Sequence, residues 1–296
     1  MATQADIESH YDEDNDFFAL FLDKKHRAYS SGIWDKATTL EDAQEAKFNR
    51  LCQYANIQPG HHVMDVGSGW GGFMNFIAEK YENSQVHAVT ISTEQFKYVN
   101  SIKKSNVTLD LCPWQNYSPS ERKYDAIVSV EVFEHFATLE ENVANRHRDV
   151  YKDFFDWCLS ISTPEAQFAL QTIVITRPPN NLIELRGSKY LQRVFPGSAM
   201  ATISDIQAAI VDKYEIAAVS RIGLDYVPTL REWNRRLELN KDIIIERYGE
   251  TLFEHYRTYF SGASSCFETG YFDVLQISLK RATSVRVLSR YLSATL

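Results

Sequence analysis

The 296-residue sequence lacks the features that define several classes of protein. It has no apolar run approaching the ~18 residues of a membrane-spanning helix, so no transmembrane segment is predicted. The N-terminal stretch MATQADIESHYDEDNDFF is polar and acidic, without the apolar centre of a signal peptide. The four cysteines are far apart and form no Cys-x-x-Cys motif, so neither a zinc site nor a disulfide framework is predicted. These absences predict a cytoplasmic protein that holds no metal.

Basic residues are also few: 31 Lys and Arg stand against 39 Asp and Glu, which gives a net charge of −8. Because binding to nucleic acid needs clustered Lys and Arg, no nucleic-acid partner is predicted. Aromatic residues, by contrast, make up 13% of the chain. Core packing explains most of them, and aromatic side chains also line apolar pockets. The length suits one large α/β domain with insertions or two small domains.

Predicted strands and helices alternate along most of the chain, which implies a parallel, doubly wound α/β sheet. We expect strands at 62–67, 85–91, 107–112, 124–130, 167–175, 214–222 and 271–282, and helices at about 40–54, 73–81, 93–104, 139–160, 204–213 and 228–261. Thr38 and Glu41 have capping-box spacing before the first of these helices, and Lys47 is the polar exception on its apolar face. Residues 177–200, with RPPNN and FPGSAM, are expected to be irregular.

No repeat, low-complexity tract or interdomain linker is visible, so we predict a single domain over 1–296 with a helical cap. Its expected parts are an N-terminal helical cap (1–57), a cofactor-binding core (58–176), substrate-side cap insertions (177–261), and a C-terminal strand and tail (262–296).

The stretch VMDVGSGWGG at 63–72 combines four glycines with an acid at the end of a predicted strand. Gly67, Gly69 and Gly72 formally fit G-x-G-x-x-G, a turn that lets a ligand approach the backbone closely. No Lys-Ser/Thr pair follows, which excludes a phosphate-binding P-loop.

This turn fits S-adenosyl-L-methionine (SAM) better than a nicotinamide dinucleotide. Asp65 lies inside the strand, where dinucleotide folds usually keep an apolar residue, and the second strand ends at Thr90 with no acid to bind a ribose. SAM has no phosphates and carries an ammonium and a sulfonium, and a carboxylate can hold a cationic ligand through charge-assisted hydrogen bonds. A SAM-binding protein without methyl transfer and, more distantly, a dinucleotide oxidoreductase are the alternatives.

Several motifs resemble, in one order, those of the cyclopropane fatty acid synthase family of SAM-dependent enzymes. They span about residues 7–280 and read HYDEDNDFFALFLD, AYSSGIW, TLEDAQEAKFNRL, DVGSGWGG, VHAVTISTEQ, YDAIVSVEVFEHF, VFPGSAM and YFSGASSCFETGYFDVLQISL. In size the chain is similar to the mycolic acid cyclopropane synthases. The resemblance implies a seven-stranded, Rossmann-like methyltransferase sheet whose last strand is antiparallel, with SAM as its cofactor.

The resemblance also assigns residues to each part of that cofactor. It places Tyr29 and Ser30 over the methionine end, Asp65 near its ammonium, Gly67 and Gly69 beneath the cofactor, Thr90 and Gln95 at the ribose, and Trp114 and Gln115 at the adenine.

On the acceptor side, the family's cyclopropane-forming members hold a bicarbonate-like anion beside the methyl group, where it removes a proton. A Cys, a Glu, a His and a Tyr bind that anion. The matching positions here are Ser31, Glu134, Gln171 and Tyr226. Two of the four residue types differ, which puts bicarbonate binding, and with it cyclopropane formation, in question.

Glu131 is a second departure, because cyclopropane synthases usually have Gly at this position. Glu131, Glu134 and His135 resemble the Glu-x-x-Glu-His pattern of coclaurine-type N-methyltransferases, in which these residues serve the amine. Two neighbouring carboxylates can attract a protonated amine, and their repulsion can raise the pKa of one of them. The alternatives are that Glu131 points into solvent or pairs with Lys or Arg, and that His135 is structural.

We therefore expect a SAM-dependent methyltransferase that acts at a nitrogen or carbon of a hydrophobic small molecule. Glu131, Glu134, His135 and Tyr226 are its candidate catalytic residues. The alternative is a cyclopropane or methyl-branch synthase that acts on an unsaturated acyl chain.

Overall fold

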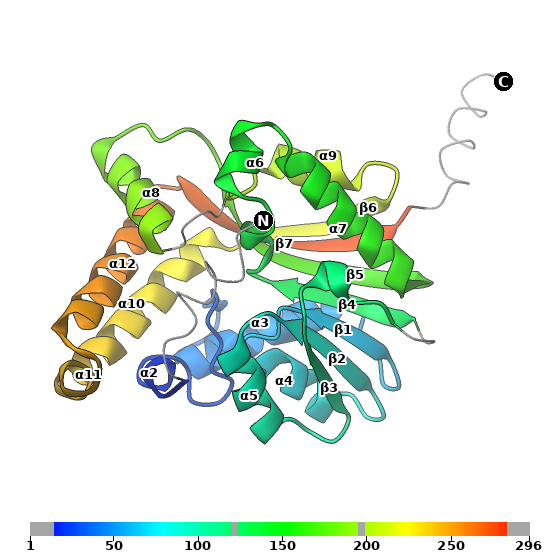
Figure 1. Ribbon diagram of the computed structural model, residues 1–296, viewed down its shortest axis with the longest axis horizontal. Coiled ribbons are helices and arrows are strands. Elements are labelled where there is room, and N and C mark those ends of the chain that lie inside the picture. The colour runs from blue at the N-terminus through cyan, green and yellow to red at the C-terminus, as the bar shows by residue number, and fades with distance from the viewer. Residues whose placement is uncertain (1–14, 120–122, 195–198, 283–296) are drawn as a thin grey trace.

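A seven-stranded sheet forms the centre of the protein in the computed structural model, which describes residues 15–119, 123–194 and 199–282. The strand order is β3-β2-β1-β4-β5-β7-β6 (Figure 1). The strands are β1 His62–Val66, β2 Gln85–Thr90, β3 Val107–Leu111, β4 Tyr124–Val130, β5 Ser162–Ile175, β6 Tyr214–Arg221 and β7 Phe272–Arg281. The first five run parallel, and β7 is antiparallel to both β5 and β6. The predicted fold class is confirmed.

Helices cover both faces of this sheet, as a parallel sheet requires. The first face packs against α3 Leu40–Tyr54, α4 Gly72–Lys80 and α5 Thr93–Ile102, and the second against α7 His147–Ile161 and α9 Ile203–Ile210 (Figure 1). The alternation along β1 shows how the sequence does this: Val63 joins the apolar cluster of α3 and α4, while its neighbour Met64 joins that of α7.

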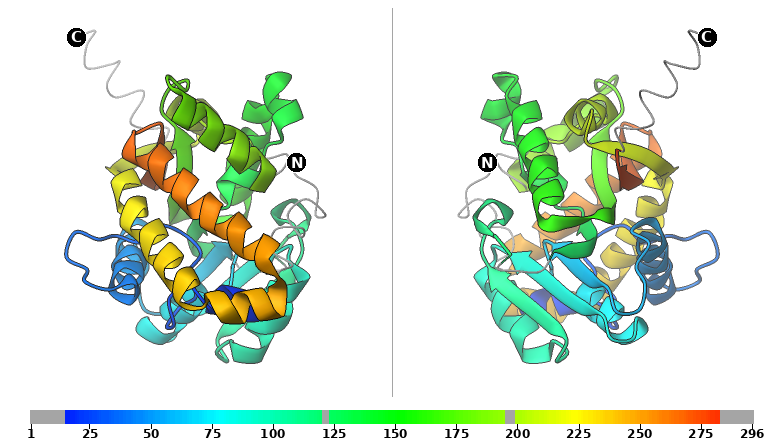
Figure 2. Two further views of the ribbon diagram at one scale, coloured as in Figure 1. Left: turned by 90° about the vertical axis from the view of Figure 1, so that its left-hand side faces the viewer. Right: turned by 90° about the vertical axis from the view of Figure 1, so that its right-hand side faces the viewer.

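The helical cap forms a third apolar cluster, which is rich in aromatic side chains. It consists of α2 Asn15–Ala19, α8 Leu182–Val194, α10 Gly223–Leu239, α11 Lys241–Tyr248 and α12 Glu250–Glu268. The helices α10 and α12 run side by side at one end of the sheet (Figures 1 and 2). The N-terminal segment packs into the same cluster, since the ring of Tyr29 contacts those of Phe18 and Trp233. The cap thereby lies beside the carboxyl ends of the first strands.

Two sequence predictions of helices need correction. The segment 177–200 is not irregular, because α8 occupies Leu182–Val194; the predicted irregular residues 195–198 lie outside the described ones. The paired prolines at 178–179 hid this helix, whose N-terminus is capped when Asn181 accepts a hydrogen bond from the Glu184 backbone N–H at 2.9 Å. The long helical stretch predicted at about 228–261 is helical, but it is divided among α10, α11 and α12, with breaks at Asn240 and Gly249.

Two smaller corrections concern helix ends. The cap of α3 is Thr39 rather than Thr38, because the Thr39 hydroxyl accepts from the Asp42 backbone N–H at 3.1 Å. The predicted helix at 139–160 is two helices, α6 Leu139–Val143 and α7, with the left-handed Asn145 between them. Within the described ranges no helix is long and apolar enough to cross a membrane.

Candidate active site

A cavity of about 410 Å³ opens at the carboxyl ends of β1, β2 and β4. In the sheet, β1 lies between β2 and β4, so the order of the strands reverses direction at β1. Open α/β sheets bind their ligands at such a point. All nine predicted cofactor residues line it, namely Tyr29, Ser30, Asp65, Gly67, Gly69, Thr90, Gln95, Trp114 and Gln115.

The turn after β1 needs its glycines for two different reasons. Gly67 has φ 87°, and a Cβ on it would lie 2.3 Å from a methyl carbon of Val132. Gly72, the third glycine of the formal motif, has ordinary φ but lies so close to the N-terminal segment that a Cβ would be 2.1 Å from the His26 carbonyl oxygen. The first glycine therefore shapes the cavity floor, while Gly72 lets the segment before Tyr29 pack down upon α4.

Asp65 has the character expected of a ligand for a cationic group. Its side chain is buried in β1 at the cavity, and within the described part of the chain its carboxylate has no hydrogen bond or ion pair. Burial raises its pKa to about 8. A buried carboxylate without partners is costly, and an ammonium group in the cavity would relieve that cost. The site therefore fits SAM on an observation independent of the glycine turn.

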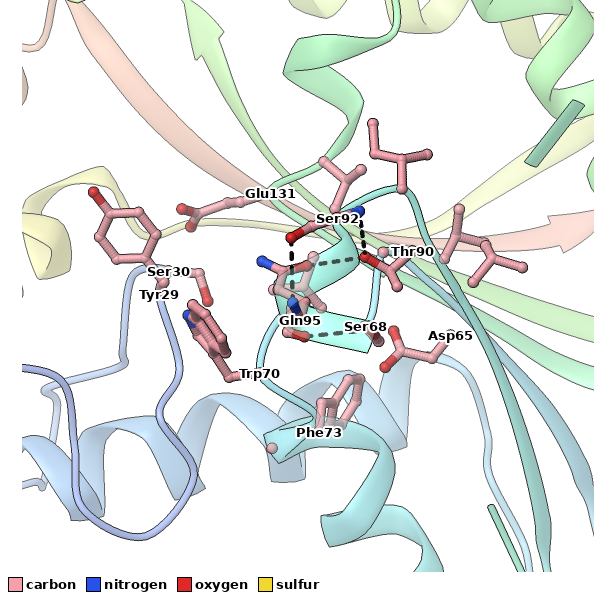
Figure 3. A pocket seen from close by; sticks show the side chains of 18 of the residues that line it. Tyr29, Ser30, Asp65, Ser68, Trp70, Phe73, Thr90, Ser92, Gln95 and Glu131 are labelled. Atoms are coloured by element: carbon pink, nitrogen blue, oxygen red, sulfur yellow. Dashed lines mark hydrogen bonds between the residues drawn. The ribbon is translucent and has the colours of Figure 1, made fainter. Parts of the chain in front are cut away.

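Hydrogen bonds join the end of β2 to the start of α5 (Figure 3). The Thr90 hydroxyl donates to the Gln95 side-chain oxygen at 3.0 Å and accepts from the Ser92 backbone N–H at 3.2 Å. Ser92 in turn caps α5 by accepting from the Gln95 backbone N–H. Both predicted ribose residues are thus fixed in one small network. At the predicted adenine end, Trp114 both lines the cavity and packs against Phe136 and Phe154.

Glu131 follows β4 directly and has φ 51°, in the left-handed region that non-glycine residues rarely adopt. Its Oε1 accepts from the Ser31 backbone N–H at 2.9 Å and from Gln171 Nε2 at 2.7 Å. Its Oε2 accepts from the Tyr226 hydroxyl at 2.9 Å. The carboxylate therefore points at these donors and not into solvent, and it forms no salt bridge with any residue that the structure describes, so both alternatives are wrong there. The backbone conformation also explains why glycine is suited to this position.

Ser31, Gln171 and Tyr226 occupy three of the four positions that the resemblance assigned to an anion. In this chain all three donate to the carboxylate of Glu131. The Ser31 hydroxyl instead donates to the carbonyl oxygen of Gly32 at 3.1 Å. The protein's own side chain thus takes the donors that would otherwise hold a small anion.

Glu134 and His135 belong to η2, Phe133–His135, next to this carboxylate. Glu134 is buried and accepts a hydrogen bond from the Ile173 backbone N–H; burial first, and then the charge of Glu131, raises its pKa to about 8. Burial also raises the pKa of Glu131, but Lys47, Gln171 and the other donors oppose that rise. The three donors around Glu131 favour its ionised form, whereas Glu134, which accepts one backbone hydrogen bond, is the acid whose protonated form burial favours more. His135 lines the cavity, and its enclosed position lowers its pKa to about 4, so its imidazole is neutral at pH 7.

One residue of this site was missed as a functional candidate. Lys47, the polar exception on the face of α3, is fully buried, and its ammonium donates to the Ser30 hydroxyl at 2.6 Å. Its position among the apolar residues of this helix face was the available signal.

The fold and this cavity are those of a SAM-dependent methyltransferase. More narrowly, the chain belongs to the mycolic acid cyclopropane synthetase family, whose model matches residues 1–277. It is 30% identical over 293 residues to cyclopropane mycolic acid synthase 2 of Mycobacterium leprae, covering 92% of each chain. It is 29% identical to cyclopropane mycolic acid synthase 1 of Mycobacterium tuberculosis, covering 94% of this chain and 97% of that one. The family resemblance is confirmed.

Solved structures agree with this assignment. The cyclopropane synthase MmaA2 from Mycobacterium tuberculosis superposes with a TM-score of 0.84 at 28% identity, covering 94% of this chain and 98% of that one. The mycolic acid cyclopropane synthase CmaA1, complexed with SAH and CTAB, gives the same values. Coclaurine N-methyltransferase, at 21% identity and a TM-score of 0.73, covers 92% of this chain and 82% of its own and shares the fold.

Proposed function

We propose that the protein transfers the methyl group of SAM to a carbon–carbon double bond of an acyl chain, with the Glu131 carboxylate in place of an external anion. This corrects the emphasis of the sequence interpretation, which favoured a general nitrogen or carbon acceptor. The observation that carries the proposal is the set of three donors from Ser31, Gln171 and Tyr226 on Glu131. Support for the substrate class comes from the full-length relatives, which are named as mycolic acid cyclopropane synthases.

SAM supplies a methyl group that its sulfonium already activates, so the residues around it have to orient the acceptor and manage charge. As the double bond attacks, a carbon–carbon bond forms, the methyl–sulfur bond breaks, and positive charge develops on the neighbouring carbon. The carboxylate of Glu131, whose pKa is raised by burial, can stabilise that charge and then accept a proton. Loss of a proton from the transferred methyl closes a cyclopropane, while loss from an adjacent chain carbon leaves a methyl-branched alkene.

The second candidate is methyl transfer to an amine, which is favoured by Glu131 and His135, both of which line the cavity; Glu134 is buried behind them and is not among the lining residues. A neutral His135 could accept the ammonium proton. The family weighs against this candidate, because the relatives of similar length are named as cyclopropane mycolic acid synthases.

The experiment is to incubate the protein with SAM and matched panels of unsaturated acyl chains, saturated acyl chains and amines, and to measure S-adenosylhomocysteine. We expect turnover with the unsaturated chains and none with their saturated counterparts. Turnover confined to the amines would overturn the proposal in favour of the second candidate.

A further inference from the structure

Two side chains of α3 reach the segment that the resemblance places over the methionine end of SAM. Lys47 Nζ donates to the hydroxyl of Ser30 at 2.6 Å, and Gln44 Nε2 donates to the carbonyl oxygen of Ser30 at 2.9 Å. Because 44 and 47 are three residues apart, they share one face of the helix. Both are fully buried, so neither group exchanges these bonds for bonds to bulk water.

The same segment is held from its other side by the acid pocket. The Ser31 backbone N–H donates to Glu131, and Gln171 Nε2 donates to the Ser31 carbonyl oxygen at 3.3 Å. Ser30 and Ser31 are therefore fixed between α3 and the carboxylate of Glu131. Ser30 and Glu131 both line the cavity (Figure 3).

Lys47 is an unusual choice for a purely structural contact. Burying an ammonium group is costly without a carboxylate partner, and no salt bridge of Lys47 is present within the described ranges. Burial lowers its pKa to about 8, and the charges that oppose this are those of Glu131 and Asp23. Lys47 Nζ also lies 4.8 Å from the centre of the Phe48 ring, a cation–π contact that offsets only part of this cost. Since a serine hydroxyl would be satisfied by a neutral donor, the rest of the cost needs another explanation.

We propose that Lys47 is a positioning residue for methyl transfer: it fixes Ser30 against the cofactor, and its positive charge, bonded one residue away from the Ser31 N–H that donates to Glu131, favours the ionised form of Glu131. The part that concerns Glu131 rests on the proposed function, whereas the part that concerns Ser30 requires only cofactor binding. The titratable groups that face Glu131 are Lys47 from α3, Glu134 from η2 and Tyr226 from α10. Those that face Lys47 in addition are Asp23 and His26 of the N-terminal segment.

The first experiment compares binding of S-adenosylhomocysteine by calorimetry in the wild type, Lys47→Met and Lys47→Gln. Methionine keeps the length without a donor, and glutamine keeps a donor without the charge. We expect Lys47→Met to bind about tenfold more weakly, the loss of one charge-assisted hydrogen bond, and Lys47→Gln to retain most of the affinity. The control is Lys36→Met, an exposed residue of the loop before α3, with wild-type affinity.

Thermal unfolding separates positioning from a structural role. Because each variant removes a buried charge, we expect the Tm of Lys47→Met to be equal to or above that of the wild type. Weaker binding with a maintained Tm supports positioning. Unchanged affinity for S-adenosylhomocysteine overturns the positioning role. Weaker binding that comes with a clear fall in Tm also overturns it, because loss of folded structure would then explain both results.

The second experiment is the pH profile of kcat/KM with an unsaturated acyl substrate. Without the neighbouring charge the pKa of Glu131 rises, so in both Lys47 variants the acidic limb should move to higher pH, while in Lys36→Met it should not. An unmoved limb overturns the charge role. If no acyl chain is turned over but Lys47→Met still weakens binding, the proposed function fails and the role of Lys47 at Ser30 stands.

Discussion

The Tyr226 hydroxyl donates a hydrogen bond of 2.9 Å to Glu131 Oε2, and so joins α10 of the cap to the residue that follows β4. Tyr226 and Glu131 are 95 positions apart along the chain. Through this contact the cap acts directly on a carboxylate that lines the cavity. Because Tyr226 would be left without its acceptor if Glu131 were removed, substitution of Glu131 tests whether this carboxylate replaces an external anion.

Replacing Glu131 should make the enzyme depend on added bicarbonate. In Glu131→Gly the carboxylate is gone, glycine adopts φ 51° without strain, and the donors of Ser31, Gln171 and Tyr226 are free to bind a small anion. We expect wild-type turnover to be insensitive to bicarbonate depletion, and Glu131→Gly to lose at least about tenfold and to regain part of it when bicarbonate is added.

Glu131→Gln is the matched control for that rescue. Its amide fills the same space, so bicarbonate should not restore its turnover. Equal rescue of both variants, or a wild type that itself requires bicarbonate, would show that the anion binds elsewhere.

Glu134 should make folding stability depend on pH in a direction opposite to most acids. Its pKa rises from 4.5 to about 8 on folding, so between these values the folded state binds more protons than the unfolded state. Its contribution to stability is full below pH 4.5 and is lost as pH rises through about 8. Glu134→Gln stays neutral throughout, so the Tm of the wild type relative to this variant should fall from pH 5 to pH 8.5.

The exposed Glu140 provides the control, because Glu140→Gln changes the same charge in α6 without burial. Comparing variants also cancels His135, whose lowered pKa costs stability as pH falls below 6.5. A wild type and variant with parallel Tm profiles would mean that Glu134 is ionised in the folded protein.

Asp65 should release a proton when the cofactor binds. Its carboxyl has a pKa of about 8 while its partner is absent, and a neighbouring ammonium would lower that value. Calorimetry at pH 7 in buffers of different ionisation enthalpy should therefore detect proton release on binding of S-adenosylhomocysteine. Asp65→Asn should bind at least about tenfold more weakly and release no such proton. Proton release that persists in the variant would place the titrating group elsewhere.

Gly67→Ala should destabilise the protein by about 2 kcal/mol or more, from backbone strain at φ 87° together with the contact with Val132. Gly60→Ala is the control, because Gly60 has a similar φ of 79° but no atom within 4 Å of the added carbon. We expect a clearly smaller loss there, measured by urea unfolding. Equal losses would mean that strain alone, and not the close approach of Val132, requires the first glycine.

The sequence predicted the sheet well because its signals are local. Apolar runs such as 63–66 and 124–130 alternate with helices, and this pattern alone specifies a doubly wound sheet. The breaks inside the cap were not predicted, because α10, α11 and α12 carry nearly continuous helical periodicity. Gly249, between α11 and α12, is the clearest signal of a break there. The helix α8 was not predicted because two prolines precede it.

The acid pocket required the three-dimensional structure for a different reason. Its composition was visible in Glu-x-x-Glu-His, but the partners of Glu131 are Ser31, Gln171 and Tyr226, which lie 100, 40 and 95 positions away. No local pattern specifies that these donors converge on one carboxylate. The partner of Lys47 could not be predicted from a local pattern either. The helix pattern identified Lys47 as a polar exception but did not indicate that it bonds to Ser30.

The most direct test of the account uses SAM labelled with ¹³C in its methyl group, an unsaturated acyl substrate, and buffer depleted of bicarbonate. The account predicts by NMR that the label enters a new carbon–carbon bond, in a cyclopropane or a methyl branch, at the same rate as with bicarbonate present. Label found only on nitrogen when amines are supplied, or no transfer until bicarbonate is added, would contradict it.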